Sequence, residues 1–432
     1  MFHIDLKELE IKKIGSVLEM RNFNMRLSSF DLLRWIILVV LALLTGFFVV
    51  YYMVAPFDVL GFYSILLAGT AGGTIFLIAT LFRGKKIFLA IIFILVFLII
   101  GFASANAVFL SQEDIYEIPS ITRTDGGDGH TAILYFTHGE PPGYDPLPWI
   151  LTMREFEHDN VPFVPWIVRP LFFNNLRNEY LEAGGSAHNK LHKAFFDNLR
   201  WSMANEEEST RFYLAFLDSE PHPDQMAAKA INEGASRIII LPVFITESTH
   251  TLAGQEMVYS VEPEKYGVEI DYTGALGNSD LLHEVFVNRA NELSFGFQKT
   301  DIGIILVGHG QPDEWEELYP EQNLQEDQYR GFIREKLLAA DFLPENVVSG
   351  WMSFQEPTIT QSAKNLVENN VKKILVFSVS LSADSIHSEV DVPKAIRSAN
   401  LPEGIQIEYI GQYVDHPLAI EALIQKISEA DT

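Results

Sequence analysis

The sequence contains no cysteine among its 432 residues. This absence excludes disulfide bonds, thiolate zinc sites and cysteine-bound iron–sulfur clusters. It leaves the redox compartment open, because a chain without thiols is compatible with either environment. Any metal ion that the protein binds must therefore be held by histidine, by carboxylates or by neutral oxygen donors.

Basic residues are scarce after residue 110. Residues 1–110 carry nine Lys or Arg and six Asp or Glu, whereas the remainder carries 22 basic and 51 acidic residues. The remainder thus has a formal net charge of −29, which repels polyanions and favours the approach of cations. We therefore exclude nucleic acid as a partner. The sequence also lacks a phosphate-binding loop, a paired-histidine metalloprotease helix and a nucleophile-elbow serine, and no organic cofactor is predicted.

Three long apolar runs occupy residues 32–54, 59–82 and 87–110. Each has about 23 residues, which is enough to cross a hydrocarbon core of about 30 Å as a helix. Buried helices of a soluble core are the alternative, but the short connections between the runs disfavour it. A cleavable signal peptide is not expected, because a mostly polar segment precedes the first run. We predict a tail over 1–30 and three transmembrane helices over 31–110, with the lipid bilayer as a partner.

The basic residues beside these runs predict the orientation of the chain in the membrane. They lie in the tail and in the second loop: Lys7, Lys12, Lys13, Arg21, Arg26, Arg34, Arg83, Lys85 and Lys86. Cytoplasmic loops are enriched in Lys and Arg, and three spans place this tail and this loop on one side. The tail is therefore predicted to be cytoplasmic and the soluble part extracytoplasmic. A cytoplasmic soluble part is the alternative.

The soluble part is predicted to be an α/β protein that follows a polar linker over 111–130. Short apolar runs typical of strands recur at 132–136, 211–217, 237–244, 268–272, 302–307, 347–351, 373–379 and 405–409. Amphipathic segments of helical period lie between several of them, at 224–233, 329–340 and 360–369. Strands that alternate with helices indicate parallel βαβ units covered on both faces.

An internal repeat divides this soluble part into two similar halves, 131–295 and 296–432. Each half has an apolar strand that ends in His-Gly-x-Pro, with His138 in the first and His309 in the second. Each continues with a segment ending in Glu-Pro, a helix and another apolar strand. Ligands of such sheets bind at the carboxyl ends of the strands, so we expect both histidines beside a cleft.

Two histidines of the second half are the main candidates for chemistry. His309 ends a strand between two glycines, which leave its imidazole accessible. His387 follows the strand at 373–379; with Ser385 as N-cap, His387 and Asp391 would share one helical face, whereas Pro393 favours an extended turn. A hydrogen-bonded turn histidine and a solvated surface histidine are the alternatives. The aromatic, proline-rich segment 144–173 could form a lid over a flat apolar ligand, a face toward the bilayer, or ordinary core.

Four segments of the soluble part resemble the ferrochelatase family. They are 180–186 (Tyr-Leu-Glu-Ala-Gly-Gly-Ser), 307–312 (Val-Gly-His-Gly-Gln-Pro), 382–391 and the final strand and helix at 411–427. The resemblance extends over about 130–430. It implies two flavodoxin-like halves with parallel sheets around a cleft, a tetrapyrrole substrate, and insertion of a divalent metal, Fe²⁺ above all, into a porphyrin in haem biosynthesis.

The resemblance also implies roles for individual residues. His309 matches the family's catalytic histidine, and His387 falls on its active-site glutamate, with Asp391 on the acidic residue four further. We expect His309 to accept a proton and make the first metal contact, His387 to act as the opposing base or ligand, and Asp391 and Glu356 to support them. The residues expected to contact the substrate are His138, Tyr180, Gly184, Gly185 and Ser186.

Histidine at position 387 departs from the ferrochelatase pattern. The segment His387-x-x-x-Asp391-Val-Pro393 is similar to sirohydrochlorin chelatases, as is Phe354-x-Glu356-Pro357, and in those relatives a histidine binds the metal. The family's Ser-Asp-His is Ala383-Asp384-Ser385 in this chain. Three functions follow as hypotheses: a ferrochelatase-like enzyme, a sirohydrochlorin chelatase for cobalt, nickel or iron, and a non-catalytic membrane protein that binds a tetrapyrrole or metal.

Overall fold

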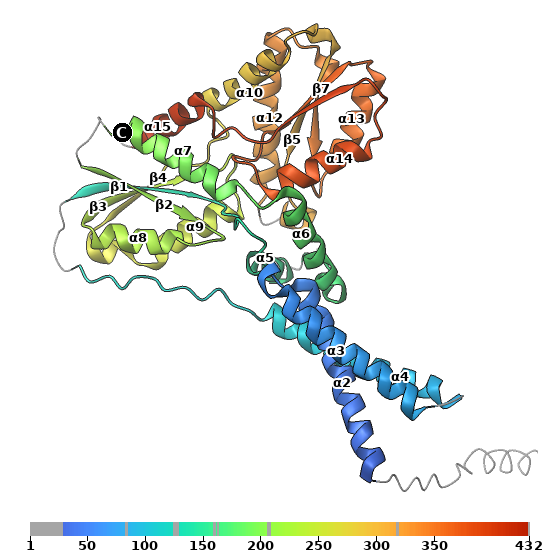
Figure 1. Cartoon of the computed structure of the whole chain (residues 1–432). Coiled ribbons are helices and arrows are strands. Elements are labelled where there is room, and N and C mark those ends of the chain that lie inside the picture. The colour runs from blue at the N-terminus through green and yellow to red at the C-terminus, as the bar shows by residue number, and fades with distance from the viewer. Residues whose placement is uncertain are drawn as a thin grey trace, which may run out of the picture. The chain divides into compact units, whose positions relative to one another are not determined.

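The computed structural model (Figure 1) describes residues 29–82, 85–123, 129–158, 161, 164–204, 209–316 and 319–430. The chain divides into two compact units. One comprises the described residues up to Tyr52 together with Val59–Phe109, and the other comprises Met53–Asp58 together with the chain from Leu110. The predicted tail, apart from its last two residues, and most of the glycine-rich turn at 125–129 lie outside the described residues.

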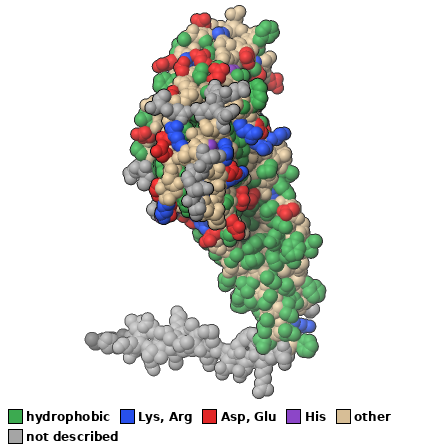
Figure 2. Space-filling model, turned by 90° about the vertical axis from the view of Figure 1, so that its left-hand side faces the viewer, with side chains coloured by type: hydrophobic (Ala, Val, Ile, Leu, Met, Phe, Trp, Pro, Cys, Tyr) green, Lys and Arg blue, Asp and Glu red, His purple; other side chains and the backbone are tan. Residues whose placement is uncertain are grey.

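Three helices long and apolar enough to cross a membrane form the first unit: α2 (Ser29–Val54), α3 (Phe57–Leu81) and α4 (Lys85–Leu110). Figure 2 shows hydrophobic side chains over the visible face of this unit, whereas acidic and basic side chains are scattered over the other. Helices α2 and α4 pack closely through glycines. A Cβ on Gly46 would lie 2.0 Å from the carbonyl oxygen of Leu98, and one on Gly101 would lie 2.0 Å from that of Leu43. Small residues of this kind let membrane helices approach.

The second unit contains two parallel four-stranded sheets with the same strand order. The first sheet has the order β2-β1-β3-β4, and its strands are β1 (His130–Thr137), β2 (Thr210–Phe216), β3 (Ala235–Pro242) and β4 (Glu269–Tyr272). The second has the order β6-β5-β7-β8, and its strands are β5 (Ile302–Gly308), β6 (Val347–Trp351), β7 (Lys373–Ser378) and β8 (Gln406–Ile410). The two similar halves predicted from the repeat are thereby confirmed, as is the flavodoxin-like fold that the resemblance implies.

Helices cover both faces of each sheet, which is why the central strands are apolar throughout. The helices of the first half are α5 (Leu147–His158), α6 (Arg169–Ala183), α7 (His188–Ser202), α8 (Pro223–Asn232), α9 (Thr249–Ser260) and α10 (Asp280–Leu293). Those of the second half are α11 (Asp313–Glu316), α12 (Glu321–Ala339), α13 (Ile359–Glu368), α14 (Val392–Ser398) and α15 (Pro417–Ala430). Short helical turns lie at η1 (Trp166–Val168), η2 (Pro263–Tyr266), η3 (Lys299–Asp301), η4 (Pro344–Asn346) and η5 (His387–Asp391).

A shared core joins the two halves. Alternate residues of a strand point to opposite faces, so Ile133 and Tyr135 of β1 enter the same buried cluster as Ile304 and Leu306 of β5. Residues of α7, α10, α12 and α15 complete this cluster. The opposite faces of the sheets pack in separate clusters, with α8 in the first half and with α13 and α14 in the second. Because the halves share a core, the loops at the ends of their strands are held in fixed relation.

All eight strands lie where the apolar runs predict them, and so do α8 and α13. Helix α12 begins at Glu321, eight residues before the predicted start at 329. The prediction missed the first turns because they are mostly polar and the apolar period starts at Tyr329. The linker packs on α8: Tyr116 Oη donates to Asp224 Oδ2 at 2.7 Å and the N–H of Thr122 donates to Asn232 Oδ1 at 2.9 Å.

Candidate active site

The strand-end histidines of both halves face one cleft with a volume of about 250 Å³. His138 directly follows β1 and His309 directly follows β5, the second strand in the order of each sheet. Each is followed by a glycine with positive φ, 98° at Gly139 and 80° at Gly310. A Cβ on Gly139 would lie 2.7 Å from the Cβ of Phe216, and one on Gly310 would lie 2.4 Å from the carbonyl oxygen of Ser353. The tight turn after each strand therefore requires glycine.

His309 presents a free ring nitrogen to the cleft. Its Nδ1–H donates to the carbonyl of Gly310 at 2.8 Å, and its backbone N–H donates to Glu326 Oε2 at 2.8 Å. Among the described residues Nε2 has no hydrogen-bond partner. Burial, together with the nearby His387, lowers the pKa of His309 to about 4. The imidazole is therefore neutral at pH 7, which is the form that binds a metal.

His387 lies at the start of the π-helical turn η5, which leads directly into α14. Ser385 caps this turn: its N–H donates to Ser388 Oγ at 2.8 Å, while its own Oγ accepts the N–H of Ser388 at 3.3 Å. These two bonds are those expected of an N-cap at Ser385, although the π-helical turn itself begins only after Ile386, which makes no side-chain cap bond. Pro393 was expected to favour an extended turn over a helix. It falls in the first turn of α14, where a missing N–H is tolerated, so helical structure forms here despite the proline.

Asp391 orients the imidazole of His387. The two are joined by a hydrogen bond of 2.6 Å between Nδ1 and Oδ2, which leaves Nε2 for the cleft. Burial disfavours the charged imidazole, but the hydrogen bond and charge of Asp391, with the charges of Glu140 and Glu179, raise the pKa of His387. The rings of His309 and His387 lie 6.4 Å apart between centroids, nearly perpendicular at 81°. The structure thus brings these two histidines together.

Glu140 reaches across the cleft from the first half to the second. Its Oε2 accepts the backbone N–H of Ile386 at 3.0 Å and the hydroxyl of Ser186. Burial raises the pKa of Glu140, against the effect of these hydrogen bonds and of His387. Glu140 is not among the site residues predicted from the sequence. Aligning the two His-Gly-x-Pro segments would have shown a carboxylate here, where the second half has Gln311.

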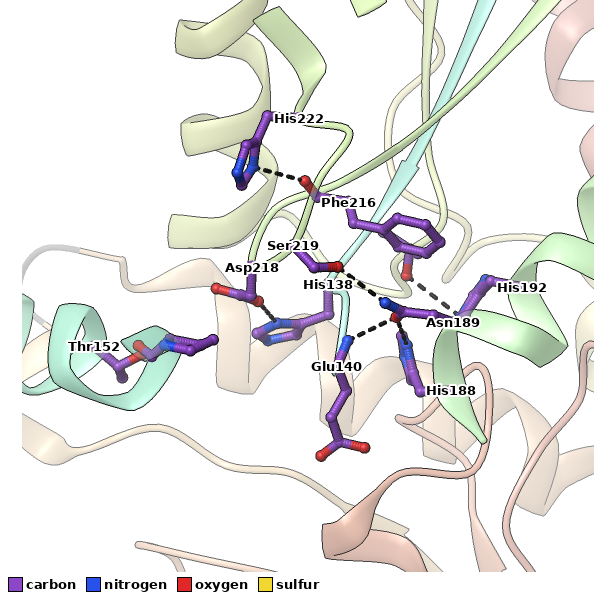
Figure 3. A network of polar contacts seen from close by, with 12 residues as sticks. His138, Glu140, Thr152, His188, Asn189, His192, Phe216, Asp218, Ser219 and His222 are labelled. Atoms are coloured by element: carbon purple, nitrogen blue, oxygen red, sulfur yellow. Dashed lines mark hydrogen bonds and ion pairs between the residues drawn. The ribbon is translucent and has the colours of Figure 1, made fainter. Parts of the chain in front are cut away.

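Further histidines of the first half lie beside the cleft. Nδ1 of His138 is hydrogen-bonded to Asp218 Oδ2 from the loop after β2, as Figure 3 shows. The same view shows Asn189, which accepts the N–H of Glu140 at 2.7 Å and donates to Ser219 at 2.9 Å. His188 also lines the cleft, and burial lowers its pKa to about 4. His250, at the start of α9, lies 4.1 Å from His138 between ring centroids.

The segment 180–186 supports the cleft more than it lines it. Tyr180 is buried and lines the cleft. Gly184 and Gly185 end α6, each donating its N–H to the carbonyl of Tyr180. Ser186 holds Glu140, as described above. Glu356 is not brought into the cleft: it is exposed and precedes the cis bond to Pro357.

The walls of the cleft are aromatic and acidic. The aromatic side chains are Trp149, Phe156, Tyr180, Phe244, Trp315 and Phe354. Two of them, Trp149 and Phe156, come from the segment 144–173, for which a lid was one prediction. No described residue that lines the cleft is Lys or Arg. Nor do three histidine or carboxylate side chains of the described residues approach closely enough to enclose an ion, so a metal held by His309 and His387 would keep positions open for another ligand.

Two flavodoxin-like halves with strand-end histidines around one cleft are the architecture of a class II metal chelatase. The chain belongs to the CbiX family, whose sequence profile matches residues 184–293 and 303–430. Chelatases of this family take a divalent metal and a tetrapyrrole as substrates.

Similar curated proteins include a ferrochelatase and a sirohydrochlorin cobaltochelatase. A ferrochelatase of Gloeothece citriformis (strain PCC 7424) is 22% identical over 281 residues, which cover 61% of this chain and 73% of that protein. A sirohydrochlorin cobaltochelatase of Sulfurisphaera tokodaii is 29% identical over 128 residues, which cover 29% of this chain and 92% of that protein. Among solved structures, SirB from Bacillus subtilis with Fe³⁺ is 15% identical, covering 70% of this chain and 95% of that one with a TM-score of 0.46.

Proposed function

We propose that this chain is a membrane-anchored, ferrochelatase-like enzyme that inserts a divalent metal, with Fe²⁺ as the first candidate, into a porphyrin. The observation that carries the proposal is the composition of the cleft. His309 and His387 face each other between aromatic walls, and the described lining contains no Lys or Arg. A flat apolar ring fits such walls, and imidazole nitrogens suit first-row divalent metals.

The missing cations favour a porphyrin over sirohydrochlorin. Carboxylates are commonly recognised by Arg or Lys. Sirohydrochlorin carries many carboxylate groups, whereas protoporphyrin carries few. Glu140, Asp218 and Glu326 also line the cleft. Placing many carboxylates beside them would cost repulsion, with no Lys or Arg in the described lining to offset it.

The pKa directions suggest how the two histidines divide the reaction. Metallation requires that the ring lose two pyrrole protons and that the metal shed part of its water. His309, whose pKa is lowered to about 4, is a weak base but a neutral ligand, so we assign it the metal contact. His387, whose pKa Asp391 raises, is the better proton acceptor, and Asp391 stabilises the imidazolium that forms. Glu140, which is close enough for its charge to raise the pKa of His387, can relay the proton.

A sirohydrochlorin chelatase is the second candidate function. It is favoured by the match to the CbiX family and by a histidine, rather than a glutamate, at position 387. In that case the imidazole of His387 would bind the metal directly.

The experiment that separates the two compares initial rates for the purified protein and for His387→Glu. Protoporphyrin, coproporphyrin and sirohydrochlorin are each offered Fe²⁺, Co²⁺ and Ni²⁺. Porphyrin metallation that survives the substitution supports the ferrochelatase-like enzyme, because glutamate also accepts protons. A loss confined to Co²⁺ and Ni²⁺ on sirohydrochlorin supports the second candidate, because an oxygen donor suits these metals less well. If neither protein metallates any ring, both proposals fail and a tetrapyrrole- or metal-binding protein remains.

For the anchor, we propose that α2, α3 and α4 span the bilayer and that the chelatase unit lies outside the cytoplasm. The proposal is supported by the length and apolar composition of the three helices and by the basic residues of the tail and of the second loop.

A further inference from the structure

Helices α7 and α12 occupy equivalent places in the two halves, and both pack into the shared core. Asn189 Oδ1 of α7 accepts the N–H of Glu140 at 2.7 Å (Figure 3). In the same way, Asn323 Oδ1 of α12 accepts the N–H of Gln311 at 3.2 Å. Glu140 and Gln311 have the same place in the two His-Gly-x-Pro segments, so the two asparagines correspond.

Three residues after each asparagine lies a buried polar side chain to which the proposed reaction assigns no role. It is His192 in α7 and Glu326 in α12. The two side chains differ in chemistry, but the shared spacing puts them at the same place on their helices. We therefore compare what each of them contacts.

Both side chains contact the end of the strand that carries the cleft histidine of their own half. Glu326 Oε2 accepts the N–H of His309 at 2.8 Å. A Cβ on Gly308, the preceding residue, would lie 2.6 Å from the same oxygen, so this carboxylate requires glycine there. Thr137 takes this place in the first half, and its Oγ1 lies 3.4 Å from His192 Nε2. His192 and Glu326 thus support equivalent points of two strands.

The same two side chains also hold the loop 379–386, which leads from β7 into η5. Ser380 Oγ donates to Glu326 Oε2 at 3.1 Å, so this bond joins the loop to α12 of its own half. Ser382 Oγ is hydrogen-bonded to His192 Nε2 at 2.9 Å, which joins the loop to α7 of the other half. The loop is therefore held from both halves at two hydroxyls.

His192 is itself fixed. It is fully buried, and burial, together with the nearby His188 and His138, lowers its pKa well below the usual value. The ring is therefore neutral at pH 7. Its Nδ1 is hydrogen-bonded to Tyr135 Oη at 2.5 Å, which orients Nε2 toward the loop. Buried polar groups that lose their partners are costly, so these bonds favour one position of the loop.

We propose that Glu326 and His192 are positioning residues, which hold the loop 379–386 so that the imidazole of His387 faces that of His309. One oxygen of Glu326 bonds both the chain at His309 and the loop that carries His387, so it sets the spacing of the two rings. His192 fixes the same loop against the first half of the cleft. This inference rests on the proposed function for its purpose, but the order of the loop can be measured without a ring.

The test removes the two hydroxyls, by Ser380→Ala with Ser382→Ala, in the full chain in detergent. The backbone carbonyl of Ser382 still accepts the N–H groups of Tyr413 and Val414, so the chain keeps its other bonds. The kcat of porphyrin metallation should fall by about 10–100-fold, since a misplacement of about 1 Å has an effect of that order. The KM for the metal should change little, because His309 keeps its bond to Glu326.

A conservative pair separates positioning from a general loss of stability. Ser380→Thr with Ser382→Thr keeps both hydroxyls and should restore kcat. Ser428→Ala removes an exposed hydroxyl of α15 and is the control, with kcat unchanged. Thermal unfolding is measured for every variant. Hydrogen exchange of the amides of residues 379–391, with no ring present, should be faster in the alanine pair alone.

Each outcome decides the proposal. Slower metallation with faster exchange, both restored by the threonine pair, supports it. An unchanged kcat in the alanine pair rejects it, and so does a loss of kcat that the threonine pair does not restore. If the unchanged protein metallates no ring, the proposed function fails, and Co²⁺ affinity decides the positioning role alone. That affinity should fall in the alanine pair, because the two imidazoles no longer face each other, and an unchanged affinity rejects the role.

Discussion

His309 and His387 are chemically different residues although both are imidazoles in one cleft. The difference comes from their hydrogen bonds: Nδ1 of His309 faces a backbone carbonyl, whereas that of His387 faces the carboxylate of Asp391. The burial that lowers the pKa of His309 is outweighed at His387 by neighbouring carboxylates. A single substitution at each position should therefore affect a different kinetic parameter.

His309→Ala should raise the KM for the metal, since the proposed metal contact is lost, and His387→Ala should mainly lower kcat. A lost general base typically costs about 10²–10⁴-fold in rate. Initial rates of porphyrin metallation at varied metal concentration measure both parameters. Equal effects of the two substitutions on KM and kcat would contradict the division of roles. His158→Ala, at an exposed histidine outside the cleft, is the control.

Asp391→Asn should move the pH dependence of metal binding to lower pH. Protons compete with metal for His387, so affinity falls as the pH drops through the pKa of this residue. Asp391 raises that pKa, and an amide removes the charge that raises it. Co²⁺ affinity is measured from pH 5 to pH 8 in a protein that carries His138→Ala and His250→Ala, so that these two histidines of the cleft do not contribute. The pH midpoint of binding should shift as described. A midpoint that stays in place, or that moves to higher pH, would contradict the assignment.

At the scale of elements, the end of α6 positions Glu140. Gly185 has a φ of 103°, and a Cβ on it would lie 2.5 Å from the carbonyl oxygen of Pro142, in the loop that follows Glu140. Gly184 also has a positive φ, 77°, but its Cβ would meet open space. Ser186, the next residue, donates to Glu140. The residues that follow the C-terminal end of α6 thus fix the carboxylate of Glu140 inside the cleft.

Gly185→Ala should destabilise the protein more than Gly184→Ala. The left-handed backbone alone costs a substituted residue about 1–2 kcal/mol, and the contact with Pro142 should add about 1–3 kcal/mol. Thermal unfolding compares the two variants directly. Equal melting temperatures would show that the loop moves aside freely. Only Gly185→Ala should also reduce metallation, because the shift displaces Ser186 from Glu140.

At the scale of the whole molecule, three apolar helices and a strongly acidic chelatase unit belong to one chain. An odd number of spans puts the two ends of the helical unit on opposite sides of a bilayer. The basic residues of the N-terminal tail therefore predict the location of the chelatase unit, although a tetrapyrrole-metallating enzyme is usually expected in the cytoplasm.

A reporter that is active only in the cytoplasm, fused after Thr432, should be silent. The same reporter fused before Met1 should be active, which controls for expression of the fusion. An active C-terminal fusion would place the chelatase unit in the cytoplasm and would show that the basic residues do not set the orientation. The reporter activities of the two fusions are measured in intact cells.

Local sequence determined the elements of this protein. Apolar runs specify the three long helices and all eight strands, because the central strands are buried on both faces and the membrane-type helices must be apolar throughout. The repeat of His-Gly-x-Pro specifies two halves, and glycine is required there by the turn itself. His309 and His387 could be selected because each follows a strand, where α/β proteins bind ligands.

Only the tertiary structure decided what surrounds those histidines. Glu140 meets Ile386, which is 246 residues further along the chain, because the shared core fixes one half against the other. Asp218, in the loop after β2, and His250, at the start of α9 after β3, both reach His138, so the strand order had to be known. Glu356 shows the converse, since a motif position gives no indication that its side chain is exposed. Sequence patterns report periodic burial along one element, whereas the partners of a cleft residue depend on packing between elements that are distant in the chain.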